Sequence, residues 1–144
     1  MNSYNNNYHA YKKASVNTTD QGTLILMLYD GIIKFLSQSR EKLIAKDYEG
    51  AHQLISKAKN ILSELLSSLN VERSGEIGRN LKSLYSFMYD RLIDANIKKD
   101  VVYVDEVIDL MNELRIGWKH VNSSKKNITQ PMSKGEAKPV HIKG

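Results

Sequence analysis

The chain has 144 residues, a length typical of one domain with its own core, and it contains no cysteine, which excludes disulfides, zinc–thiolate sites and thiol nucleophiles. Its longest apolar run is Leu24–Tyr29, far short of the ~20 residues that a membrane-spanning helix needs, and the opening segment lacks the apolar stretch of a signal peptide. We therefore expect a cytoplasmic protein that does not insert into a membrane.

The net charge of +5 is concentrated at the C-terminal end of the sequence. Five lysines and one glutamate lie between Asn122 and Gly144, so the rest of the chain is nearly neutral. Proteins that bind DNA specifically carry a basic patch on the folded domain, whereas here the positive charge lies in the C-terminal segment and residues 1–121 are nearly neutral. We expect no nucleic acid as partner, and a nucleic-acid binder acting through this tail is the least favoured alternative.

The predicted elements, in chain order, are a polar arm over residues 1–17 and four amphipathic helices. Each helix follows a residue whose side chain caps helix N-termini: Thr18, Asp47, Ser74 and Asp100. The helices are expected at Thr19–Lys46, Tyr48–Asn70, Gly75–Lys98 and Val101–Val121. Residues 122–144 hold both prolines and are rich in Ser, Lys and Gly, a composition that predicts disorder.

The predicted fold class is all-α, an antiparallel up-down four-helix bundle over residues 18–121. The connections between the helices are short, which favours antiparallel neighbours, and no stretch alternates in polarity as a half-buried strand does. One apolar stripe on each helix is expected to form the core. On the third helix this stripe is Ile77, Leu81, Leu84, Met88, Leu92 and Ala95; on the fourth it is Val104, Val107, Met111, Leu114 and Trp118.

Three of the helices carry apolar residues beside the core stripe, and these are the candidate partner-binding residues. They are Leu26, Ile33 and Ile44 on the first helix, Leu54 and Ile61 on the second, and Tyr103 and Leu110 on the fourth. They either widen the core or form an interaction surface. Because a bundle has one core, the same excess on three helices favours grooves that receive amphipathic helices of a partner.

The polar arm carries three tyrosines, Tyr4, Tyr8 and Tyr11, spaced so that a helical turn would place them on one face. Two interpretations stay open. The arm is disordered, or Tyr8 and Tyr11 pack on a groove as a movable cover.

No arrangement of residues indicates an enzyme. Glu49 and His52 form a single Glu-x-x-His pair, whereas di-iron bundles need two such pairs and two further glutamates. Catalytic triads, phosphate-binding loops and dinucleotide motifs are absent from the sequence. We expect no catalytic residue, no cofactor and no metal.

Several segments carry a family resemblance through their order and spacing. They are Tyr8–Tyr11, Ser15–Thr18, Leu24–Gly31, Phe35–Leu36, Tyr89–Lys98, Glu106–Val107 and Leu114–Lys119. Together they resemble the flagellin export chaperone family (FliS) from about Tyr8 to Val121. The sequence departs from the family at Asp20, where a proline is frequent, but an acidic residue in the first turn of a helix is equally compatible with the fold.

This resemblance implies a cytosolic bundle that binds the disordered C-terminal segment of flagellin. Flagellin wraps around such a chaperone as short helices, which blocks premature filament assembly and presents the subunit to the export gate. Several apolar grooves on different helices agree with a wrapping ligand. The alternative is a self-associating bundle whose extra stripes form a homodimer interface; for the free chain we expect a monomer or a weak homodimer.

Overall fold

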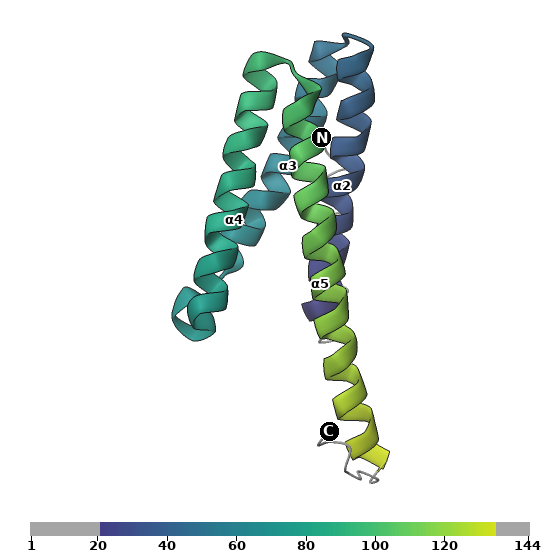
Figure 1. Ribbon diagram of the computed structural model, residues 1–144, viewed down its shortest axis with the longest axis vertical. Helices are drawn as coiled ribbons and strands as arrows, with labels where there is room; N and C mark the ends of the chain where they lie inside the picture. The colour runs from purple at the N-terminus through teal and green to yellow at the C-terminus, as the bar shows by residue number, and fades with distance from the viewer. Residues whose placement is uncertain (1–20, 135–144) are drawn as a thin grey trace.

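A computed structural model describes the backbone of residues 21–134 and the side chains of residues 21–123. This part of the chain forms four helices and contains no strand: α2 (Gln21–Ile44), α3 (Tyr48–Ser68), α4 (Val71–Lys98) and α5 (Val101–Lys134) (Figure 1). The predicted all-α four-helix bundle is confirmed. The predicted arm over residues 1–17, the cap Thr18 and residues 135–144 lie outside the described residues.

Each helix of the bundle packs mainly against two others. Helix α2 contacts α3 and α5, and α4 contacts the same two helices from the opposite side of the core. The connections are short enough to reverse the chain between consecutive helices, and two of them use a residue in the left-handed region, Lys46 with φ 63° and Lys99 with φ 55°. The result is an antiparallel ring of four helices.

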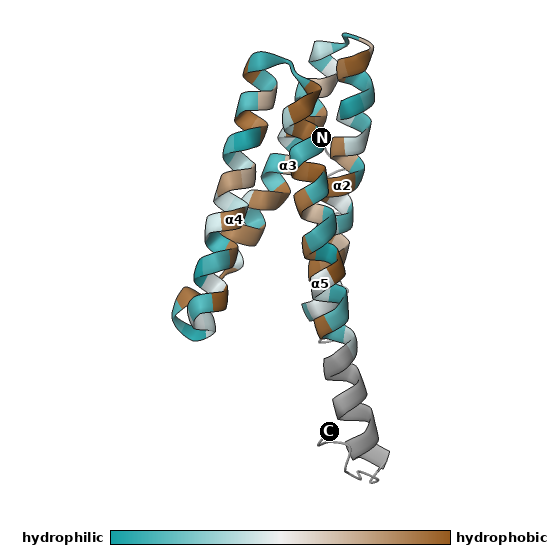
Figure 2. Cartoon of the chain, in the orientation of Figure 1, coloured by the Kyte–Doolittle hydropathy of each residue, from teal (hydrophilic) through white to brown (hydrophobic). Residues whose placement is uncertain are grey.

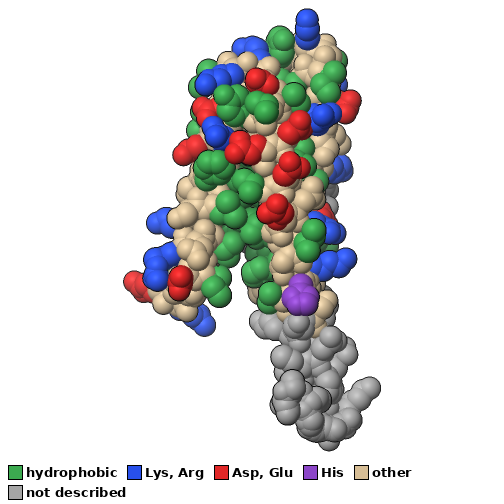
Figure 3. Space-filling view, viewed as in Figure 1, with side chains coloured by type: hydrophobic (Ala, Val, Ile, Leu, Met, Phe, Trp, Pro, Cys, Tyr) green, Lys and Arg blue, Asp and Glu red, His purple; other side chains and the backbone are tan. Residues whose placement is uncertain are grey.

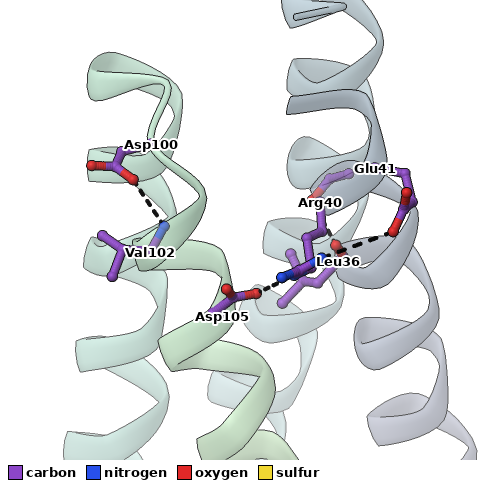
Figure 4. Close-up of polar contacts among 7 residues, drawn as sticks. Leu36, Arg40, Glu41, Asp100, Val102 and Asp105 are labelled. Atoms are coloured by element: carbon purple, nitrogen blue, oxygen red, sulfur yellow. Dashed lines mark hydrogen bonds and ion pairs between the residues drawn. The ribbon is translucent and has the colours of Figure 1, made fainter. Parts of the chain in front are cut away.

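Two of the predicted helix caps are confirmed. The carboxylate of Asp47 accepts a hydrogen bond of 3.0 Å from the backbone N–H of Gly50, and that of Asp100 accepts one of 3.0 Å from Val102 (Figure 4). Both bonds satisfy backbone donors that have no partner inside their own helix.

The predicted cap of the third helix, Ser74, is wrong. Asn70 caps α4, since its Oδ1 accepts a hydrogen bond of 3.1 Å from the N–H of Arg73. An extra helical turn then precedes Gly75, whose φ of 63° and ψ of −130° interrupt the helix. Only glycine adopts such a conformation without strain, so Gly75 separates this first turn from the body of α4.

Helix α5 also differs from the prediction, because it continues to Lys134 rather than ending at Val121. The sequence contains neither glycine nor proline between Gly117 and Pro131, so the two residue types that most often end a helix are absent from that stretch. The start of the predicted disordered tail is therefore helical.

The core consists of apolar side chains from all four helices, including Ile32 and Leu36 of α2 and Leu62 of α3, each fully buried. The prediction that Ile61 lies beside the core is wrong, since only 3% of its surface is exposed. Gly31 on α2 explains its burial: a Cβ atom at this glycine would come within 3.2 Å of Ile61 Cδ1. The missing side chain lets α3 approach α2 closely enough to cover Ile61.

An apolar groove between helices α4 and α5

Helices α4 and α5 are joined through Lys99 and Asp100, and they pack tightly in the half that follows this connection. The side chains that meet there are completely buried: Met88, Leu92 and Ala95 from α4, and Val104, Val107 and Met111 from α5. We call these six residues the closed seam. Away from the connection the two helices diverge, and α4 tilts outward toward its N-terminal end (Figure 1).

Arg91 covers the outer edge of the closed seam. Its Nε lies 3.0 Å from Oε1 of Glu106 on α5, and its Nη1 lies 3.5 Å from Oδ2 of Asp94. The guanidinium also lies over the rings of Phe87 and Tyr103, with 5.2 and 5.4 Å to the ring centroids. Arg91 therefore connects α4 with α5 through one ion pair, to Glu106, and one cation–π contact, with Tyr103.

Where the helices diverge, a groove with a volume of about 540 Å³ lies between them. Glu113 is the only charged residue among those that line it: Ile77, Leu81 and Leu84 from α4, and Leu110, Glu113, Leu114, Gly117, Trp118 and Val121 from α5. Hydrophobic positions recur along both helices, and hydrophobic side chains gather between them in the space-filling view (Figures 2 and 3). A surface of this kind can bind the apolar face of another helix.

The groove changes the role of residues that the sequence pattern assigned to the core. Ile77 is 69% exposed, so its assignment to the core is wrong. Leu81, Leu84, Leu114 and Trp118 pack against the core but stay partly exposed. Their helical spacing directs them toward the bundle axis, but the divergence of α4 from α5 leaves them without a facing helix.

Helix α5 is held in place by polar contacts with α2. Arg40 Nε donates a hydrogen bond of 2.7 Å to Oδ1 of Asp105 (Figure 4), and this bond raises the pKa of the guanidinium. Arg115 pairs with Asp30, and Trp118 Nε1 donates a hydrogen bond of 3.2 Å to the carbonyl of Gly22. The α5 wall of the groove is thus fixed to α2.

A buried tyrosine pair connects α2 with α4 across the core. The hydroxyl oxygens of Tyr29 and Tyr85 lie 2.6 Å apart, and both side chains are buried. Burial raises the pKa of each hydroxyl, because the apolar surroundings disfavour the phenolate. Tyr85 follows the groove residue Leu84 directly, so this hydrogen bond fixes α4 near the point where the groove begins. The sequence analysis missed this pair.

The structure brings one of the predicted partner-binding residues into the groove, Leu110. Tyr103 lies on the same helix but beside the closed seam, where Arg91 and Lys98 contact its ring. Leu26, Ile33 and Leu54 are partly exposed on α2 and α3, and Ile44 is 55% exposed at the end of α2. These four do not line the groove, and Tyr8 and Tyr11 lie outside the described residues.

Sequence reasoning missed the groove residues on α4, namely Ile77, Leu81 and Leu84. Two glycines at the start of α4 could have indicated that these residues are not covered by α5. Gly75 and Gly78 stand at the start of α4, where two helix-weakening residues accompany a break in the helix direction. Such a break indicates that the part of α4 after Gly75 does not have to run parallel to α5.

Other features of the described residues indicate no second chemical site. Glu49 and His52 line a smaller cavity of about 230 Å³ at the end of the bundle where α2 meets α3. Within residues 21–123 no three His, Cys, Asp or Glu side chains lie close enough to hold a metal ion. Among the described helices, none has the length and apolarity to cross a membrane.

Comparison with known proteins identifies the family. The family described as "Flagellar protein FliS" matches residues 4–125. The flagellar secretion chaperone FliS of Bacillus subtilis (strain 168) is 37% identical over 121 residues, which cover 84% of this chain and 90% of the relative. That of Escherichia coli (strain K12) is 34% identical over 121 residues, 83% of this chain and 89% of the relative.

A more distant relative, the flagellar secretion chaperone FliS of Campylobacter jejuni, is 27% identical over 117 residues, which cover 81% of this chain and 91% of the relative. The family match over residues 4–125 includes all the residues that line the groove. FliS is a family of chaperones and not of enzymes. The chain belongs to the FliS family of flagellar secretion chaperones.

Proposed function

We propose that this flagellar export chaperone binds the disordered C-terminal segment of flagellin in the cytoplasm, through the groove between α4 and α5. Covering this segment prevents premature polymerisation of flagellin and keeps the subunit in a form that the flagellar export gate receives. The single observation that carries the proposal is an apolar groove of about 540 Å³ that the chain itself leaves uncovered within its described residues.

The spacing of the groove residues supports a helical ligand. The α4 wall presents Ile77, Leu81 and Leu84, and the α5 wall presents Leu110, Leu114 and Trp118. Both walls therefore follow the i, i+4, i+7 or i+8 spacing of one helix face. An amphipathic helix with apolar residues at the same spacing can place its side chains between these rows and supply the missing packing partner.

A disordered ligand that folds on binding suits a chaperone that must release its cargo. Ordering the ligand costs about 2–5 kcal/mol of the gross interaction, which limits the affinity of a large contact. We propose that Leu26, Ile33, Ile44, Leu54 and Tyr103 provide further contacts for a segment that continues around the bundle, since each is at least partly exposed.

The polar arm before α2 belongs to the same proposal. Helix α2 begins at Gln21, and the carbonyl of Gly22 accepts the hydrogen bond from Trp118, a residue that also lines the groove. The arm is therefore attached near one end of the groove. We propose that Tyr8 and Tyr11 cover the groove in the free chain and leave it when flagellin binds.

Calorimetry with a peptide of the flagellin C-terminal segment tests the proposal. We expect one-to-one binding with a negative heat-capacity change, because apolar surface is buried. Two isoleucines on α4 offer a matched pair, Ile77 inside the groove and Ile97 outside it, exposed by 69% and 68%. Ile77→Asp should weaken binding about tenfold or more, since burying such a side chain contributes about 1.5–3 kcal/mol, whereas Ile97→Asp should leave the affinity unchanged.

Equal effects of the two substitutions would show that the peptide does not use the groove, and the absence of any heat at micromolar concentration would contradict flagellin as ligand. Light scattering distinguishes the alternative of self-association. A stable dimer that Ile77→Asp dissociates would mean that a second copy of the chain occupies the groove.

A further inference from the structure

The α5 edge of the groove is acidic. Glu113 lines the groove, and Asp109 and Glu106 precede it at distances of four and seven residues along α5. Residues with this spacing lie on one side of a helix. In the space-filling view, acidic side chains form a row over α5 beside the hydrophobic side chains between α4 and α5 (Figure 3).

Only part of this acidic row is neutralised within the described residues. Glu106 pairs with Arg91 at the closed seam. No basic side chain among residues 21–123 comes within 4.0 Å of the carboxylates of Asp109 or Glu113. Arg115, the nearest cation in sequence, pairs with Asp30 of α2 instead.

On the α4 side, none of the residues that line the groove is charged, and the basic residues of this stretch, Arg79 and Lys82, line a separate pocket with Phe87 and Asp90. On α4, the exposed Glu76 precedes the groove residue Ile77 and has no ion pair among the described side chains. The basic residues that follow the groove on α5, Lys119 and His120, come after Trp118 at its far end. A ligand seated beside Leu110 and Leu114 therefore meets negative charge along its α5 flank.

We infer that the segment bound in this groove is an amphipathic helix with a cationic flank, whose Lys or Arg side chains lie against Asp109 and Glu113. The inference rests on the proposed function and specifies the chemistry of its ligand. An apolar row fixes which face of a bound amphipathic helix enters the groove but not the direction in which the helix runs along it. A flank charged on one side selects one direction and disfavours helices with acidic flanks, because like charges repel across the interface.

Charge reversal on the full-length chain tests the inference, with the flagellin C-terminal peptide as probe. Neutralising both carboxylates, with Asp109→Asn and Glu113→Gln, should weaken binding about threefold, and Glu113→Lys should weaken it about tenfold. The affinity of the wild-type chain should fall as salt increases, and that of the neutralised variant should fall less. Glu49→Lys is the control, since Glu49 is an exposed acid at the other end of the bundle.

A series of peptide variants tests whether a charge change in the ligand compensates for Glu113→Lys in the chaperone. Each Lys or Arg of the peptide is replaced by Glu in turn, and we expect one replacement to restore most of the affinity for the Glu113→Lys variant while weakening binding to wild type. Because Glu113 is exposed, circular dichroism should show the same helix content for this variant as for wild type.

Three results would overturn the inference. If Glu113→Lys, Glu49→Lys and wild type bind the peptide equally well while Ile77→Asp does not, the groove binds flagellin without a charge preference. If Glu113→Lys binds more tightly, the carboxylate instead attracts the arm, which carries Lys12 and Lys13 next to Tyr11. If wild type does not bind the peptide, the proposed function fails and the inference fails with it.

Discussion

The closed seam and the groove are both formed by α4 and α5, and both have apolar residues at helical spacing. They differ in that the residues of the closed seam are buried and those of the groove are exposed to solvent. In the closed seam, Leu92 of α4 and Val107 of α5 are completely buried, whereas Leu81, about three turns before Leu92, and Leu110, about one turn after Val107, stay partly exposed. The comparison shows that an apolar stripe becomes core only where the neighbouring helix is close enough to cover it.

The distance between the two helices is set at their ends. At the closed seam, the short connection through Lys99 and Asp100 and the Arg91–Glu106 ion pair keep α4 beside α5. At the other end, α4 is preceded by the turn that Asn70 caps and Gly75 separates from the helix body. That end follows α3, and no described ion pair connects it with α5.

Matched leucine truncations should give the largest difference between the two stretches. Leu92→Ala should lower the free energy of unfolding by about 2–5 kcal/mol, because it leaves a cavity in a fully packed region. Leu110→Ala should cost much less, since water already reaches its side chain, but it should weaken binding of the flagellin peptide. Denaturant unfolding followed by circular dichroism, together with calorimetry, measures both effects.

Equal destabilisation by Leu92→Ala and Leu110→Ala would show that the groove is packed in solution as tightly as the closed seam. In that case the groove residues would belong to the core, and the argument from uncovered apolar surface would be wrong.

The tyrosine pair at the junction of the two stretches should give an intermediate effect. Tyr85→Phe leaves the buried hydroxyl of Tyr29 without its partner, which should cost about 1–3 kcal/mol of unfolding free energy. Replacing both tyrosines by Phe should cost less than the sum of the two single replacements, because no buried hydroxyl is then left unpaired. Strict additivity in denaturant unfolding would contradict a hydrogen bond between them.

The same pair predicts a loss of stability in alkaline solution. The folded state keeps both protons above pH 10, because burial raises the pKa of Tyr29 and of Tyr85 above 10.0, the ordinary value for tyrosine. The unfolded chain loses these protons near pH 10, so it binds fewer protons and the free energy of unfolding decreases as the pH rises further. The double Phe variant should show a weaker decrease.

Removing the cation at the edge of the closed seam should have the smallest effect. Arg91→Met keeps most of the aliphatic volume but removes the ion pairs with Glu106 and Asp94, at a cost of about 1 kcal/mol or less because the side chain is about one-third exposed. Amide hydrogen exchange should become faster around Leu92 and stay unchanged around Leu81. Faster exchange around both would mean that Arg91 also controls the width of the groove.

Much of the fold was predictable because it depends on local chemistry. The caps Asp47 and Asp100 and the stripe that contains Leu62 follow from residue type and helical spacing, and all three agree with the structure. The cap of α4 was not predictable in the same way. Asn70 and Ser74 are both good capping residues, and the helical turn that Asn70 begins ends at Gly75 after only one turn.

The site was predictable only in part. Helical spacing identified Leu110 as an apolar residue beside the core stripe, and the structure places it in the groove. The same reasoning assigned Ile61 to the surface and Ile77 to the core, and both assignments are reversed. The side of a helix on which a residue lies follows from its position in the sequence, but its burial depends on the distance to the next helix.

The sequence by itself determined four amphipathic helices, their order, their antiparallel connections and the resemblance to FliS, because these follow from spacing, capping and short loops. Only the tertiary structure decided which apolar residues are covered. Gly31 brings α3 onto α2 and buries Ile61, whereas the divergence of α4 from α5 exposes Ile77 and opens the groove. The physical reason is that a side chain is buried only when a second helix packs against it, whereas the sequence pattern shows only which face of its own helix is apolar.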